Sequence, residues 1–169
     1  MKKIFFILFG LIHLNAMSQN LFIDTFLEKW GNSKIYLIQL AEAMPESQYA
    51  YKPTEKQKTF AEQLIHIKGN IDWLSKTYFG DGSLQKEQTN TTPTKKQLID
   101  ALKTSFDVSA SLIANLETEK LAEKVDFFAG RKTKMQIMNL LQDHVTHHRG
   151  QLIVYLKLNQ IEPPQYSGW

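Results

Sequence analysis

Three of the five histidines lie within a segment of five residues near the end of the sequence. His144 and His148 are four residues apart, so in an α-helix their side chains lie on the same face, one turn apart. Two imidazoles at this spacing can ligate one metal ion. His147 is an alternative second ligand, but it lies about 100° around the helix from His148. We therefore expect His144 and His148 to form the pair, with His147 assisting or replacing His148 as the alternative.

A further histidine, His66, lies in a second stretch with helical periodicity. Glu62 and Asn70 are its neighbours on the adjacent helical turns. A helical bundle can place this stretch beside the last helix, and His66 then completes three nitrogen ligands. Three protein ligands leave one position open for water or substrate, as in catalytic zinc sites. The alternative is that the histidines are hydrogen-bonded core residues without a metal.

Three polar residues near the histidines are candidates for catalysis. An open metal site lowers the pKa of bound water to about 7, and a nearby carboxylate can then act as general base. Glu62 precedes His66 by one turn, but it also occupies the third position of a capping box, which gives it a structural partner. Asp143 directly precedes the histidine pair and is displaced from it by about 100°. Asn70 is a candidate for a hydrogen bond to a ligand or to bound water.

Four helices must position these side chains. Apolar residues recur at helical spacing from Phe22 to Met44, and Pro45 ends this first helix. Three capping boxes predict the starts of the others: Thr59-x-x-Glu62, Thr94-x-x-Gln97 and Thr133-x-x-Gln136. These helices are expected to end near Phe79, Leu116 and Asn159, with loops over residues 45–58 and 83–92 and a short strand near Val125–Phe128. The pattern predicts an all-α protein, a four-helix bundle of about 150 residues.

The N-terminal segment has the pattern of a secretory signal peptide. Its parts are a basic start (Met1-Lys2-Lys3), a short apolar run (Ile4–Ile12) and small residues at Ala16 and Ser18. The run is shorter than the roughly 20 residues that a transmembrane helix needs. We predict a signal peptide over residues 1–18 and a mature domain over residues 19–169 that is exported, either periplasmic or secreted. The alternative is a buried N-terminal helix.

Charge and composition exclude several classes of protein. Two of the 20 Lys+Arg residues fall in the signal peptide, which has no acidic residue, so the formal charge falls from +3 to +1 on cleavage. This balance argues against a nucleic-acid partner. The chain has no cysteine, which excludes disulfides, thiolate ligands and a lipoprotein anchor, so no membrane anchor remains after cleavage. With no thiolate available, histidine imidazole is the ligand expected for a borderline divalent metal ion.

Two residues after the histidine pair carry structural expectations. Arg149 is expected to pair with Asp143 or with a carboxylate from a loop. Gly150 costs about 1 kcal/mol relative to alanine inside a helix. We therefore expect Gly150 to pack closely against a neighbouring helix.

Taken together, the motifs resemble the DinB/YfiT-like superfamily of metal-dependent four-helix-bundle proteins. The resemblance extends from Leu21 to Trp169. It rests on six motifs: Met44-Pro45-Glu46, Tyr51-Lys52-Pro53-Thr54, Thr59-Phe60-Ala61-Glu62 followed by His66, His144-x-x-x-His148-Arg149-Gly150-Gln151, Tyr155-Leu156 and Pro163-Pro164. Each motif alone is weak, and their order and spacing make them specific together.

The resemblance implies that His66, His144 and His148 are the three metal ligands, and it supports His148 over His147. It also implies a divalent ion, zinc or nickel, both of which imidazole ligands suit. Superfamily members with known activity include transferases and isomerases that use low-molecular-weight thiols such as bacillithiol or mycothiol. The predicted export departs from these members, because the cytosolic thiol pool does not follow a protein through the membrane.

We expect an exported protein that binds a divalent metal ion and acts on a small molecule as a metal-dependent hydrolase or thiol transferase. The alternative is a non-catalytic bundle that binds a metal or another ligand. A monomer and a homodimer are both compatible with the sequence.

Overall fold

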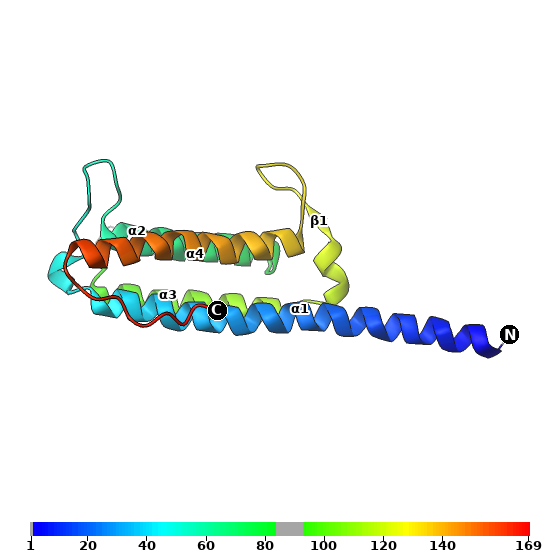
Figure 1. Ribbon diagram of the computed structural model, residues 1–169. Coiled ribbons are helices and arrows are strands. Elements are labelled where there is room, and N and C mark those ends of the chain that lie inside the picture. The colour runs from blue at the N-terminus through cyan, green and yellow to red at the C-terminus, as the bar shows by residue number, and fades with distance from the viewer. Residues whose placement is uncertain (1, 84–92) are drawn as a thin grey trace.

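The computed structural model describes the backbone of residues 2–83 and 93–169, and side chains from residue 21 onward within these ranges. In chain order the elements are α1 (Lys2–Ala43), η1 (Glu46–Gln48), α2 (Phe60–Tyr78), α3 (Lys95–Ala114), η2 (Thr118–Ala122), β1 (Lys124–Val125), β2 (Lys132–Thr133) and α4 (Lys134–Leu158). The four α-helices form a bundle of two layers, with α2 and α4 in one and α1 and α3 in the other (Figure 1). The predicted all-α fold is confirmed.

Local sequence signals place the helix ends close to where they were expected. At the start of α2, the Thr59 hydroxyl accepts a hydrogen bond from the Glu62 backbone N–H, and the Glu62 carboxylate accepts one from the Thr59 N–H at 2.7 Å. The same reciprocal capping begins α3 and α4. Proline ends α1 as predicted, since that helix finishes at Ala43. All but the first residue of the predicted loop 83–92 lies outside the described residues.

The four helices do not alternate in direction. Lys95, at the start of α3, donates from Nζ to the carbonyl oxygen of Met44, just beyond the end of α1, at 2.7 Å. Tyr155, near the end of α4, donates from its hydroxyl to the carbonyl oxygen of Lys58, just before α2, at 2.8 Å. Therefore α1 is antiparallel to α3, and α2 is antiparallel to α4. Because α2 and α3 both start at the end where α1 finishes, they run in the same direction (Figure 1).

The core lies between the layers. Its largest fully buried side chains are Trp30, Phe60, Phe106, Leu37, Leu40, Met44, Leu64, Ile67, Ile71, Leu74, Leu102 and Ile113. The rings of Trp30 and Phe106 are 4.5 Å apart, and the indole N–H of Trp30 donates to the Phe106 carbonyl at 3.2 Å. This hydrogen bond satisfies the one polar atom of the largest core side chain.

The segment before α4 contains a small hairpin. Strand β1 pairs antiparallel with β2, with Lys124 opposite Thr133 and Val125 opposite Lys132. Of the strand predicted near Val125–Phe128, only Val125 lies in a strand of the structure. Strand β2 leads directly into α4, because its last residue, Thr133, is the N-cap of that helix.

The helix α1 begins at Lys2 and continues without a break through the predicted signal peptide. Its N-terminal part extends beyond the other helices (Figure 1). Cleavage after Ser18 stays a prediction. Among the described residues, no helix is both long and apolar enough to cross a membrane.

The expectations for Arg149 and Gly150 are both wrong. Arg149 is only 3% exposed, and its guanidinium lies 5.2 Å from the ring centre of Tyr36 and 5.9 Å from that of Tyr166. Aromatic rings therefore replace the expected carboxylate, because the C-terminal segment folds back along the bundle. A Cβ on Gly150 would meet nothing within 4 Å, whereas one on Gly168 would lie 2.7 Å from the Arg149 guanidinium nitrogens.

Two glycine substitutions test this packing. Gly168→Ala should lower the free energy of unfolding by roughly 1–2 kcal/mol, because the methyl group must displace a guanidinium held between two rings. Gly150→Ala is the matched control and should raise it by about 0.5–1 kcal/mol, because it removes a helix-interior glycine where space is open. Urea denaturation of each variant measures both effects, and a stabilising Gly168→Ala would contradict the described packing.

Candidate metal centre

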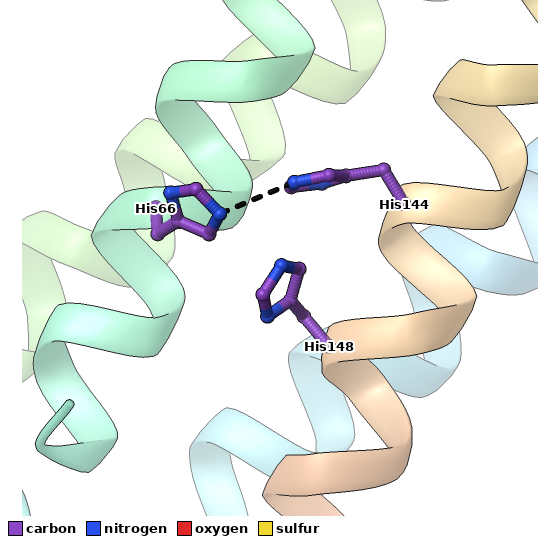
Figure 2. Close-up of side chains that lie close together, drawn as sticks. All are labelled: His66, His144 and His148. Atoms are coloured by element: carbon purple, nitrogen blue, oxygen red, sulfur yellow. Dashed lines mark hydrogen bonds between the residues drawn. The ribbon is translucent and has the colours of Figure 1, made fainter. Parts of the chain in front are cut away.

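The structure brings three histidines from two helices together. His66 comes from α2, and His144 and His148 come from adjacent turns of α4. Their imidazoles point toward one another across the space between the helices (Figure 2). The Nε2 atoms of His66 and His144 are 3.2 Å apart, and one ring nitrogen from each of the three residues lies within 4.8 Å of the others. All three side chains are half-buried.

This arrangement fits a divalent metal ion. Zinc lies about 2.0–2.1 Å from imidazole nitrogens, so two ligands of a tetrahedral ion are roughly 3.3 Å apart. The 3.2 Å between the His66 and His144 Nε2 atoms matches that spacing. Imidazole nitrogens also suit nickel and other first-row metals, so the donor set does not select one metal. Three protein donors would leave a position open.

The surroundings keep the histidines neutral. Burial, followed by the neighbouring histidines, lowers the pKa of His144 to about 4. Burial, followed by His66, His147 and Lys58, lowers the pKa of His148 to about 4. The pKa of His66 is also lowered, first by burial and then by the Lys58 ammonium. Neutral imidazole is the form that binds a cation, so no proton has to be displaced at pH 7.

A buried glutamine orients His148. Gln63 is 4% exposed, and its Oε1 lies 2.9 Å from the His148 Nδ1. Because an amide oxygen only accepts, this contact places the proton on Nδ1 and leaves the Nε2 lone pair free. Gln63 in turn donates from Nε2 to Gln151 Oε1 at 2.6 Å and to the Tyr155 hydroxyl at 3.4 Å. A metal-ligating histidine is usually held by such a partner on its other nitrogen.

His147 and His144 have hydrogen-bond surroundings that differ from those of His148. His147 lies outside the three-histidine group, and its Nε2 is 2.9 Å from the Gln151 amide nitrogen. Through Gln151 it joins the hydrogen-bond network of Gln63. The Nδ1 of His144 is buried and has no hydrogen-bond partner among the described residues. Within the three-histidine group, His148 is thus the one histidine whose tautomer is selected by a described side chain from outside the group.

The three catalytic candidates take different places. Glu62 lines the same cavity as His66, but its carboxylate is engaged by Thr59, whose two hydrogen bonds lower the pKa of Glu62. Asn70 is half-buried, and its Oδ1 has no hydrogen-bond partner among the described residues. Asp143 is exposed and lines a separate cavity beside Phe127 and Leu140. The structure therefore brings Glu62 to the histidines and leaves Asp143 apart from their cavity.

The match to known proteins covers nearly the whole chain. The model of the DinB family matches residues 17–168. The chain belongs to the DinB family. It is 28% identical over 133 residues to YjoA of Bacillus subtilis (strain 168), described as an uncharacterized protein, covering 76% of this chain and 86% of that one.

Solved structures share the DinB fold. A DinB-like protein of Bacillus subtilis (YjoA) has a TM-score of 0.72 and 23% identity, covering 86% of this chain and 99% of its own. A DinB-like protein of Bacillus cereus ATCC 10987 has a TM-score of 0.72 and 16% identity, covering 84% of this chain and 95% of its own. A conserved protein of Enterococcus faecalis has a TM-score of 0.63 and 15% identity, covering 80% and 95% respectively. These likenesses establish the fold.

Two residues at the centre were not anticipated from the sequence. Gln63 precedes His66 by three residues and so shares its side of α2, which is the one local signal for it. The capping-box motif points to its neighbour Glu62 and gives no indication of Gln63. Lys58 precedes the helix and has no motif of its own. Both residues acquire a role only because α4 packs beside the start of α2.

Substitutions at Gln63 test its orienting role. Gln63→Leu should weaken zinc binding by about tenfold or more, because His148 loses the partner that selects its tautomer. Gln63→Glu keeps an acceptor and should retain binding. Competition with a chromophoric chelator at pH 7 measures the affinity.

The matched control is Gln142→Leu. Gln142 is also a buried glutamine, but it lies on α4 and donates a hydrogen bond to the Ser33 hydroxyl. This substitution should lower stability and leave zinc affinity unchanged. Equal zinc affinities for Gln63→Leu and the unaltered protein would show that Gln63 does not orient a ligand.

Proposed function

We propose that this DinB-family chain binds one divalent metal ion, zinc or nickel, through His66, His144 and His148. With that ion it acts on a small molecule as a hydrolase or transferase. The observation that carries the proposal is the convergence of three neutral imidazoles beside a cavity of about 450 Å³ that reaches His66. Pockets of this size suit small ligands.

A divalent ion supplies Lewis-acid chemistry at such a site, polarising an oxygen of a substrate or of water. The chain's own residues supply the rest. The Gln63 amide oxygen accepts a hydrogen bond from the His148 Nδ1 at 2.9 Å, which leaves the Nε2 of that ring free to bind a cation. Glu62 places a carboxylate in the cavity wall, where its lowered pKa keeps it ionised at neutral pH. Asn70 lies one turn after His66, and its amide oxygen has no hydrogen-bond partner among the residues that the structure describes.

The second candidate function is metal or ligand binding without catalysis. It is favoured by the state of the two carboxylates, because Glu62 is engaged in capping and Asp143 lines a different cavity. A general base must reach the proton that it abstracts. An engaged carboxylate and one at a different cavity therefore favour binding without catalysis.

We also propose that the protein is exported and that residues 1–18 are removed. The basic start, the short apolar run and the small residues before Gln19 support this. The family match begins at residue 17, so the leader lies almost entirely outside the matched domain. Outside the cytoplasm, a hydrolytic reaction is favoured over one that consumes a cytosolic thiol.

Metal analysis of untagged protein tests the centre. We expect close to one zinc or nickel ion per chain, a strong loss in His66→Ala and His148→Ala, and no loss in the control His147→Ala. If both alanine variants at His66 and His148 bind as much metal as the unaltered protein, the three-histidine centre is wrong.

Turnover separates the two candidate functions. Metal-loaded protein is assayed on esters, amides, phosphoesters and thiol conjugates, with His66→Ala as the inactive reference. Turnover that is absent in His66→Ala supports the enzyme. Metal binding with no turnover on any of these substrates supports the binding protein.

The export proposal has an independent test. N-terminal sequencing of native protein should begin at or near Gln19, because signal peptidase cleaves after small residues. Full-length protein that retains Met1 and accumulates in the cytoplasmic fraction would contradict export. This result leaves the metal centre unaffected.

A further inference from the structure

The cavity beside His66 has a basic wall. Its lining residues are Lys56, Gln57, Lys58, Glu62, Ile65 and His66. Among the described residues, neither Lys56 nor Lys58 forms an ion pair, whereas Lys52 in the same loop pairs with Glu55. The wall of the cavity thus contains two lysines that form no ion pair with a described residue, and it also contains His66.

The one carboxylate in this wall is already engaged. Glu62 accepts a hydrogen bond from the Thr59 backbone N–H at 2.7 Å, and that bond caps α2. Its charge offsets one of the two lysines. The remaining positive charge, together with that of a divalent ion between neutral imidazoles, makes the cavity attractive to anions.

The position of Lys58 is built into the fold. Its carbonyl oxygen accepts a hydrogen bond from the Tyr155 hydroxyl at 2.8 Å, which ties the loop to α4. The same hydroxyl lies 3.4 Å from the Gln63 amide nitrogen, so the loop and the orientation of His148 share one network. Lys58 and His66 line the same cavity, so this lysine lies in the wall next to the histidine group.

We propose that the ligand of this site is a small organic anion whose carboxylate or phosphate group is held by Lys58, with Lys56 beside it. The inference rests on the proposed metal centre and specifies the class of molecule that it takes. Ile65 supplies an apolar surface in the same wall, which suits the carbon skeleton of such a molecule. A neutral molecule of the same shape gains nothing from the lysine and should bind less well.

Binding of simple probes tests this. Zinc-loaded and metal-free protein, both labelled with ¹⁵N, are titrated with acetate, inorganic phosphate and neutral acetamide at constant ionic strength. We expect saturable amide shifts around residues 56–66 with acetate and phosphate, and much weaker shifts with acetamide. Acetate and phosphate distinguish the two kinds of anionic group.

Matched charge variants identify the lysine. Lys58→Gln should raise the dissociation constant of the anions by about threefold to tenfold, the range expected for losing one partly exposed charged contact. Lys29→Gln removes the same charge from an exposed position on α1 and should leave it unchanged. Zinc content is measured for every sample.

The outcomes separate this inference from the proposed function. If zinc binds but acetate and acetamide shift the same amides equally, or if Lys58→Gln binds anions as tightly as Lys29→Gln, the anion inference is overturned and the metal centre stands. If no zinc binds, the proposed function fails. Anion binding to the metal-free protein that depends on Lys58 would still support the anion site.

Discussion

The rotation of α2 against α4 is the constraint on which the centre depends. Each of two ligand candidates is followed by a fully buried apolar residue: Ile67 after His66, and Val145 after His144. Successive residues are about 100° apart around a helix, so each histidine lies beside the buried stripe and not within it. The apolar contact between the helices therefore holds the imidazoles half-buried and facing one another. A change of rotation would either expose them or bury them in the core.

Half-burial also sets the chemistry of the imidazoles. Burial is the largest cause of the lowered pKa of His144 and His148, about 4 for each, and the cavity beside the centre reaches His66. Gln63 is more deeply buried, and a buried amide without hydrogen-bond partners lowers the stability of the fold. Its hydrogen bonds to His148 and Gln151 satisfy both ends of the amide. Stability and ligand orientation are thus served by the same side chain.

The direction of the helices decides what surrounds the centre. Short connections favour antiparallel neighbours, but residues 79–94 separate α2 from α3, and α3 starts at the same end of the bundle as α2. As a result α2 starts beside the end of α4. In that arrangement the Tyr155 hydroxyl, near the end of α4, binds the Lys58 carbonyl just before α2. Asp143 lies on an earlier turn of α4 and lines another cavity.

Features that depend on residues close together in the chain were determined by the sequence itself. The capping boxes, the proline that ends α1 and the shared face of His144 and His148 involve residues at most four apart. The bundle prediction offered His66 as a third ligand, and the resemblance supported the set of three. Only the tertiary structure decided the partners of Gln63 and Arg149, since Gln63 meets His148 across 85 residues of chain, and Arg149 meets Tyr166 through a C-terminal segment that folds back. Such contacts arise from packing between whole helices, and spacing along the chain carries no signal for them.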